Sequence, residues 1–155
     1  MTPSERLGAL GLKLPAVPEP AGSYVPASRS GDLIFTAGQL PFLESELHRT
    51  GKVGETVSPE DAHECARLCA LNALAAAADK AGDLDALHAV VKVTGFVASA
   101  PGFNGQPAVL NGASELFGEL FGDAGLHARS AVGVAELPLD VPVEVEVVFA
   151  LTSPA

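Results

Sequence analysis

The chain has 155 residues, 48% of them apolar, which fits one domain spanning residues 1–155 with a sizeable core and no need for a disulfide framework. Asp and Glu outnumber Lys and Arg by 19 to 9, and the resulting net charge of −10 repels phosphate backbones, so we expect no nucleic-acid partner. No apolar run approaches the roughly 20 residues of a membrane-spanning helix, and the N-terminus lacks the features of a signal peptide, so we expect a cytoplasmic protein with no membrane partner.

The first 21 residues are predicted to form an N-terminal arm. Residues 4–11 fit a short capped helix that ends at Gly11. Three prolines between positions 15 and 20 exclude a helix there and require an extended chain. We expect residues 1–21 to lie on the surface of the domain as an extension of it.

Two strands are predicted before the first long helix. The apolar residues 33–37 follow a turn at residues 30–32 and lead into Gly38, a glutamine, a leucine and a proline. This pattern is typical of a backbone that turns sharply at the end of a buried strand. Residues 46–50 fit a second, more exposed strand.

A long helix is predicted for residues 59–81. Ser58 can cap its N-terminus, a proline and two acidic residues suit its first turn, and Gly82 can end it. Residues 68–78 are apolar nearly all round, with Asn72 as the exception. We expect this helix to pack against a sheet on one side and against another element on the other.

Two cysteines, Cys65 and Cys69, lie one turn apart in this predicted helix. Small apolar side chains at this spacing share one face, which is typical of packing residues. A metal site would need two further ligands, and the sequence around His63 lacks the second histidine of a zinc-protease motif. We therefore predict no metal site.

The second half of the chain is predicted to form three strands and a second helix. The first of these strands covers residues 88–99, and the helix covers residues 107–121. The other two strands lie on either side of a connection at residues 137–142. The whole order indicates a mixed sheet with two helices on one face. Because the strands at 33–37 and 145–151 are too apolar for a wet face, we expect a homo-oligomer that covers the other face.

One arginine stands out in the penultimate strand. Arg129 shares its strand face with Ala131 and Gly133, which suggests a guanidinium with empty space in front of it, as a small-anion site would need. Taken alone, a strand arginine is more often a surface or ion-pair residue. In the last strand, Glu144 and Glu146 share the face opposite the valines and would ordinarily form a solvated stripe.

Several short motifs occur in a set order and spacing along the chain. They are Tyr24-Val25, Phe35-Thr36-Ala37-Gly38-Gln39-Leu40-Pro41, Asn111, Ala128-Arg129-Ser130, Leu137-Pro138 and Val143-Glu144-Val145-Glu146. Together they resemble the RidA (YjgF/YER057c/UK114) family, some members of which carry the label "endoribonuclease L-PSP". The resemblance runs from about Gly22 to Leu151, and residues 94–114 look like a longer subgroup with an N-terminal extension.

The resemblance implies an α+β, chorismate-mutase-like fold. It also implies a homotrimer whose sheets pack into a central barrel, with three clefts between subunits. Archetypal members hydrolyse 2-imino acids, or enamine tautomers such as 2-aminoacrylate, to 2-oxo acids and ammonia without a cofactor. The expected partners are therefore a small carboxylate-bearing substrate and further copies of this chain.

The resemblance also assigns site residues. Arg129 would clamp the substrate carboxylate, because its planar fork suits a bidentate contact that lysine cannot reproduce. Glu144 would position or activate the attacking water. Tyr24, the backbone of Gly38 and Asn111 would line the pocket.

Two departures from the family pattern bear on substrate choice. Ala37 stands where the family commonly has serine, which removes a pocket hydroxyl, and Ala131 stands where many members have cysteine. A non-catalytic trimer that binds small carboxylates or 2-oxo acids through Arg129 is therefore the alternative. Ribonuclease activity follows only from the family label, and the acidic charge counts against it.

The last two strands raise a geometric question. In a tight hairpin, Arg129 would lie about 17 Å along the ladder from the position opposite Glu144. The two residues could share a site only if the strands are not hairpin partners or if the site spans subunits.

Overall fold

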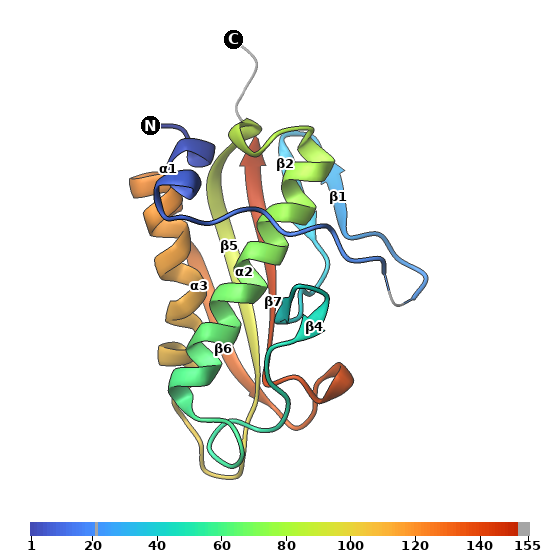
Figure 1. Ribbon diagram of the computed structural model, residues 1–155, viewed down its shortest axis with the longest axis vertical. Coiled ribbons are helices and arrows are strands. Elements are labelled where there is room, and N and C mark those ends of the chain that lie inside the picture. Colours follow the sequence, from blue (N-terminus) through green and yellow to red (C-terminus); the bar gives the residue numbers. More distant parts are fainter. Residues whose placement is uncertain (21, 152–155) are drawn as a thin grey trace.

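Five strands form one mixed sheet, and two long helices lie side by side across one of its faces (Figure 1). The computed structural model describes residues 1–20 and 22–151. The strand order is β1-β2-β7-β5-β6, in which only β5 and β6 run parallel. This arrangement confirms the predicted mixed sheet with two helices on one face. The elements are β1 (Ala27–Ser30), β2 (Leu33–Thr36), β5 (Leu87–Ala98), β6 (Ala128–Val134), β7 (Val143–Leu151), α2 (Pro59–Ala81) and α3 (Gln106–Phe121).

Shorter elements connect and flank these layers. A separate two-stranded hairpin follows β2, and a short helix begins the chain. Three 3₁₀ turns lie between the main elements. These elements are α1 (Pro3–Ala9), β3 (Phe42–Leu43), β4 (Glu46–Leu47), Leu84–Ala86, Gly122–Gly125 and Pro138–Asp140.

Helix α2 has the bounds that the sequence predicts. The Ser58 side chain accepts a hydrogen bond from the backbone N–H of Asp61 at 3.1 Å, and Gly82 ends the helix in a left-handed conformation at φ +92°. Residues 68–78 are all buried, between the sheet, α3 and the N-terminal arm. The two cysteines, Cys65 and Cys69, are buried and unpaired, in agreement with a packing role.

The alternating pattern of β7 sets the core. Val143, Val145, Val147, Phe149 and Leu151 are buried beneath the helices. The residues between them point to the opposite face of the sheet. The apolar side of this strand is therefore core, as the sequence predicts.

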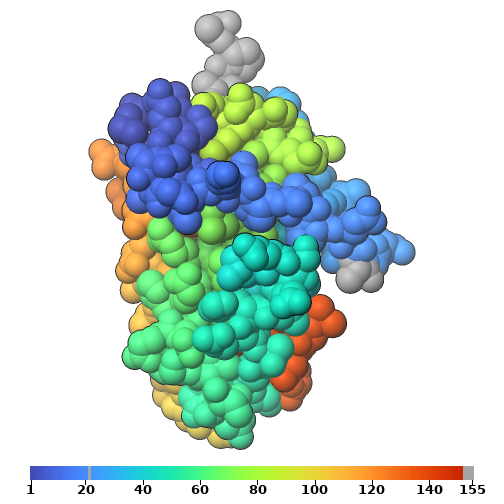
Figure 2. Space-filling view, in the orientation of Figure 1, coloured from blue at the N-terminus to red at the C-terminus, as the bar shows by residue number. Residues whose placement is uncertain are grey.

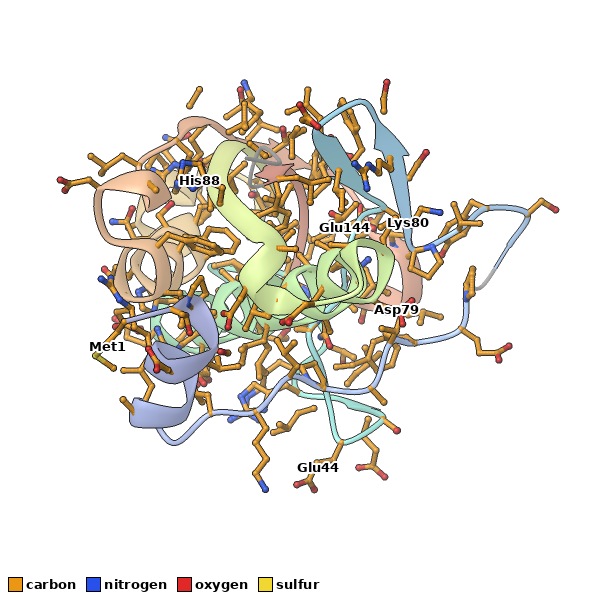
Figure 3. The ribbon with its side chains drawn as sticks, turned by 90° about the horizontal axis from the view of Figure 1, so that it is seen from above. Met1, Glu44, Asp79, Lys80, His88 and Glu144 are labelled. Atoms are coloured by element: carbon orange, nitrogen blue, oxygen red, sulfur yellow. The ribbon has the colours of Figure 1, made fainter. Side chains whose placement is uncertain are left out.

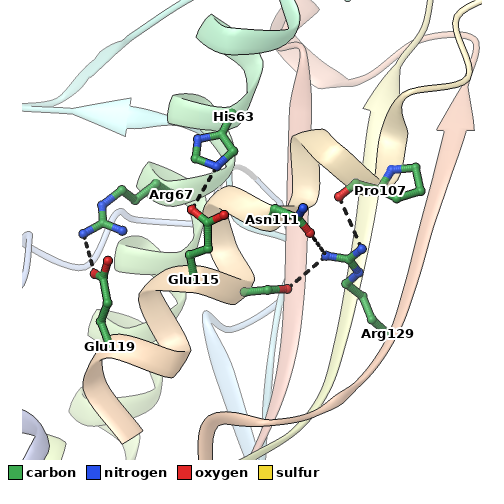
Figure 4. A network of polar contacts seen from close by, with 8 residues as sticks. His63, Arg67, Pro107, Asn111, Glu115, Glu119 and Arg129 are labelled. Atoms are coloured by element: carbon green, nitrogen blue, oxygen red, sulfur yellow. Dashed lines mark hydrogen bonds and ion pairs between the residues drawn. The ribbon is translucent and has the colours of Figure 1, made fainter. Parts of the chain in front are cut away.

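Helices α2 and α3 approach each other closely at Gly112 of α3. A Cβ at this position would overlap the backbone carbonyl of His63 on α2. Two ion pairs connect the same helix faces, between His63 and Glu115 at 3.1 Å and between Arg67 and Glu119 at 2.8 Å (Figure 4). The close approach fixes α3 in place above the edge of the sheet.

The N-terminal arm crosses the outer side of α2. The side chain of Thr2 caps α1 in a capping box with Glu5, so the helix begins slightly earlier than predicted. Beyond α1 the chain is extended and lies over the green surface of α2 (Figure 2). Leu14 and Val17 of this segment pack against the core. Viewed from above, the arm and the β3–β4 loop that carries Glu44 lie on the far side of α2 from the sheet (Figure 3).

The structure differs from the prediction at two strands. Strand β1 was not predicted, because only Ala27 of its four residues is buried and the others give no apolar alternation. It pairs with β2 across a turn at Gly31, whose φ is +59°. The predicted strand at residues 46–50 is only the two-residue β4, which pairs with β3 outside the main sheet.

No helix among the described residues covers the second face of the sheet (Figure 1). Phe35 on β2 and Val132 on β6 are each 44% exposed there, and Phe96 on β5 is half-buried. Polar side chains share the same face, including the contact of Lys92 with Ser130 at 3.3 Å. The face therefore carries both exposed apolar side chains and polar ones.

Candidate functional site

Arg129 lies on the edge strand β6 and points toward α3. Its Nη1 donates to the side-chain oxygen of Asn111 at 2.9 Å and to the hydroxyl of Ser114 at 3.1 Å (Figure 4). Its Nη2 donates to the backbone carbonyl of Pro107 at 3.3 Å. The first three turns of α3 therefore hold the guanidinium from one side.

These contacts determine which donors of Arg129 remain. A guanidinium has five N–H groups, and three of them bond to Asn111, Ser114 and Pro107. Within the described part of the chain, the Nε hydrogen and one Nη2 hydrogen have no protein acceptor. Donors on two neighbouring nitrogens are what a bidentate contact with a carboxylate requires.

The space beside Arg129 is less empty than the sequence suggests. The side-chain nitrogen of Gln106 lies 2.8 Å from where a Cβ of Gly133 would be, and the Ser99 hydroxyl lies 3.0 Å from it. Gly133 is thus small because these side chains occupy the space in front of it.

A second layer of contacts lies behind Arg129. The Ser114 hydroxyl is 2.9 Å from Nε2 of His127, and Nδ1 of His127 is 2.6 Å from the carbonyl oxygen of Gly125. The His127 ring meets Phe117 edge-on, with centroids 5.9 Å apart. Sequence analysis did not assign Ser114 or His127 to the site.

Two spacings in the sequence could have indicated these residues. Asn111 and Ser114 are three apart on a helix, and His127 and Arg129 are two apart at the start of a strand, so each pair shares a face. Only the approach of α3 to β6 shows that the two faces meet. That approach is not readable from local sequence.

Glu144 lies near the start of the central strand β7, on the face of the sheet that the helices leave uncovered. It borders an open cleft of about 620 Å³. Burial raises the pKa of the Glu144 carboxyl above its ordinary value, and the negative charge of Glu146 raises that pKa further. The residues that line the cleft include Tyr24, Phe35, Ala37, Gly38, Pro138 and Glu144.

Gly38 lies directly against the Glu144 carboxylate. A Cβ at position 38 would lie 2.8 Å from Cδ and 2.9 Å from Oε1 of Glu144. Backbone hydrogen bonds between Gln39 and Val145, at 2.8 and 3.0 Å, hold the two segments together. Asn72 of α2 donates to the carbonyl oxygens of Leu40 and Phe42, which anchors the same segment. Because Gly38 has no side chain, the Glu144 carboxylate can occupy this position against the backbone.

Arg129 and Glu144 do not meet within one chain. Strand β5 separates β6 from β7, so the last two strands are not a hairpin. Arg129 is level with Val93 of β5, and Glu144 is level with Phe96. This offset is about 10 Å along the strands and about 10 Å across them. The two side chains also point to opposite faces of the sheet.

The five predicted site residues therefore form two groups. Arg129 and Asn111 are in direct contact at the α3–β6 edge. Tyr24, Gly38 and Glu144 line one cleft near the start of β7. A single chain does not bring the two groups together.

Neither group is placed for metal binding. Among residues 1–20 and 22–151, no three histidine, cysteine or acidic side chains lie close enough to hold a metal ion. Burial raises the pKa of the Cys65 thiol to about 12 and that of Cys69 well above its ordinary value. Both thiols therefore stay protonated and unsuited to nucleophilic chemistry. None of the helices in this part of the chain is long and apolar enough to cross a membrane.

A family model described as "YjgF/chorismate mutase-like, putative endoribonuclease" matches residues 4–151. The chain belongs to the YjgF/RidA family. Protein TCP17 of Trypanosoma cruzi is 41% identical over 148 residues, which cover 95% of this chain and 92% of that protein. The 2-iminobutanoate/2-iminopropanoate deaminase of Salmonella typhimurium is 34% identical over 131 residues, covering 84% of this chain and 89% of the deaminase.

The structural comparison agrees with this assignment. The crystal structure of Atu1372 from Agrobacterium tumefaciens, a protein of unknown function, matches with a TM-score of 0.89 and 40% identity, over 97% of this chain and 92% of that one. The family model confirms the predicted chorismate-mutase-like fold. The matches to TCP17 and Atu1372 span nearly the whole chain, whereas the match to the deaminase is shorter. This difference agrees with the longer subgroup that the sequence indicates.

Proposed function

We propose that this chain is a cofactor-independent deaminase that hydrolyses small 2-imino acids, or their enamine tautomers such as 2-aminoacrylate, to 2-oxo acids and ammonia. The observation that carries the proposal is Arg129, which α3 holds by three hydrogen bonds while two donors remain for a carboxylate. The 34% identity to a named 2-iminobutanoate/2-iminopropanoate deaminase supports the same reaction class.

The chemistry needs few groups. The carbon of a protonated imine is already electrophilic, so holding the substrate carboxylate on Arg129 supplies orientation. Water adds to that carbon as the C–N π pair moves onto nitrogen, and Glu144 accepts the proton that the water releases. Glu144 then returns this proton to the carbinolamine nitrogen, and ammonia leaves as the C–O π bond of the 2-oxo acid forms. The hydroxyl proton passes to Glu144 and from there to the released ammonia, so the carboxylate is restored. The raised pKa of Glu144 makes it a better base than an ordinary glutamate.

We further propose that the working site lies between copies of the chain in a homotrimer. Arg129 and Glu144 act together only if they come from different chains, because within one chain they face opposite sides of the sheet. The uncovered face, with Phe35 and Val132 each 44% exposed, is a surface on which a second copy could pack. The Glu144 cleft would then face the Arg129 edge of a neighbouring copy.

The direct test is an assay of the purified protein with an amino-acid oxidase or dehydratase that generates a 2-imino acid. Semicarbazide traps the imine that has not been hydrolysed. We expect the wild-type chain to accelerate 2-oxo-acid release over the background, and Arg129→Ala and Glu144→Gln to remove most of the acceleration. Arg49→Ala is a matched control, because Arg49 is an exposed arginine that pairs only loosely with Asp61, at 3.6 Å. No acceleration with any of several imino acids would refute the proposal.

A non-catalytic carboxylate-binding trimer is the second candidate. The observation that favours it is that the Arg129 group is complete without Glu144, whereas Ala37 and Ala131 replace a hydroxyl and a thiol that other family members carry. For such a protein, Arg129→Ala would abolish binding of a 2-oxo acid, Glu144→Gln would leave binding intact, and no turnover would be detected.

A further inference from the structure

The contacts behind Arg129 extend the site beyond the residues that touch substrate. We propose that His127 is a positioning residue, which orients the carboxylate-binding guanidinium of Arg129 through the hydroxyl of Ser114. This inference rests on the proposed role of Arg129 as the carboxylate anchor. It concerns a histidine that the reaction itself does not require.

The hydrogen-bond directions follow from the partners. The carbonyl oxygen of Gly125 can only accept, so Nδ1 of His127, at 2.6 Å, carries the hydrogen of that contact. A neutral ring then leaves Nε2 as an acceptor, and the Ser114 hydroxyl, at 2.9 Å, donates to it. With its proton directed at His127, the Ser114 oxygen turns a lone pair toward Nη1 of Arg129, at 3.1 Å.

The result is one directed chain from the guanidinium to the backbone. Arg129 donates to Ser114, Ser114 donates to His127, and His127 donates to Gly125. Each bond polarises the next, and the final acceptor is part of a 3₁₀ turn that cannot rotate away. His127 therefore determines which way the Ser114 hydroxyl points, and Ser114 in turn holds Arg129.

This chain fixes the donors that substrate would use. With Nη1 committed to both Asn111 and Ser114, the guanidinium plane cannot turn about its own axis. The Nε hydrogen and the remaining Nη2 hydrogen then keep one direction before substrate arrives. A preorganised fork binds a carboxylate more tightly than a mobile one, because less side-chain freedom is lost on binding.

The alternative role for His127 is packing alone. Its ring is half-buried and stacks edge-on against Phe117 at an interplanar angle of 90°. Phenylalanine would fill the same space but would have neither ring nitrogen. Glutamine loses the ring but brings a side-chain oxygen that can accept the Ser114 hydroxyl. The two substitutions therefore separate packing from positioning.

The experiment measures the affinity of the full-length protein for pyruvate by NMR titration, and KM and kcat for a 2-imino acid. For His127→Phe we expect pyruvate affinity to fall, and KM to rise, by about 5- to 10-fold, with kcat changed less than KM. His127→Gln should recover most of the affinity, and Ser114→Ala should resemble His127→Phe. His88→Phe is the control, because His88 is exposed near the start of β5, outside the part of that strand that pairs with β6, and its substitution should not alter pyruvate affinity.

Each outcome decides the inference. Wild-type affinity in His127→Phe and Ser114→Ala would overturn it, as would equal losses in His127→Phe and His127→Gln. If His127→Phe does not fold, Ser114→Ala carries the test alone, since it breaks the same chain with a smaller change. If pyruvate binds in a His127-dependent manner but no imine is hydrolysed, the deaminase proposal fails and this inference stands. If wild-type protein binds no pyruvate, Arg129 is not a carboxylate anchor and this inference fails.

Discussion

The two halves of the candidate site differ in how complete they are within one chain. Arg129 is held by three hydrogen bonds to α3, with Ser114 and His127 behind it. Glu144 borders an open cleft, makes no hydrogen bond to another described side chain, and carries a pKa raised by burial and by Glu146. The Arg129 guanidinium thus has hydrogen-bond partners from α3 within one chain, whereas the Glu144 carboxylate has no described side chain that donates to it. This contrast is what a site shared between copies would leave in each of them.

The largest expected loss of activity follows from substitution of Arg129. Arg129→Ala should lower kcat/KM for a 2-imino acid by at least about 100-fold, because a fixed charged fork to the carboxylate is lost. Arg129→Lys should recover little, since an ammonium cannot reproduce contacts to Asn111, Ser114 and substrate at once. Steady-state kinetics of the two variants would test this. If the activity of Arg129→Lys were near that of the wild type, only the positive charge at this position would matter.

A somewhat smaller loss of activity is expected from a substitution beside Glu144. Gly38→Ala places a Cβ within 3 Å of the Glu144 carboxylate and should displace it, lowering kcat by roughly 10- to 100-fold. Pyruvate affinity should stay close to wild type, because Arg129 is untouched. Gly118→Ala is the control, since a Cβ there meets no atom within 4 Å. A loss of pyruvate affinity in Gly38→Ala with unchanged kcat would assign the two halves the other way round.

The smallest effect concerns the pH dependence of Glu144. The carboxylate must be ionised to accept a proton, so activity should fall as pH drops through its raised pKa. Glu146→Gln removes a like charge that contributes to the raised pKa, so the acidic limb of the kcat profile should move to lower pH. Added salt should move the wild-type limb in the same direction. A limb that stays in place in Glu146→Gln would mean that burial alone sets the pKa.

The sequence was sufficient for the elements with strong local signals. Helix α2 was predicted to the residue because Ser58 and Gly82 cap it, and the buried side of β7 followed from its alternation. Strand β1 was missed because it is a polar edge strand, and its pairing depends on β2.

The site was predictable only in part, for a related reason. The identities of Arg129 and Glu144 came from motifs, and strand parity determines which face each residue takes. Their separation depends on β5 lying between β6 and β7, which is a non-local feature of the topology. Ser114 and His127 were missed because they meet Arg129 only where α3 approaches β6. Local sequence does not report that contact.

The most direct measurement is subunit complementation between Arg129→Ala and Glu144→Gln. Each variant alone should be nearly inactive, because each of its sites lacks one of the two groups. After the two are unfolded together and refolded at equal amounts, random trimers should regain about a quarter of wild-type activity, since that share of the interfaces combines an intact arginine with an intact glutamate. Mixtures that stay as inactive as the separate variants would contradict a site shared between neighbouring copies.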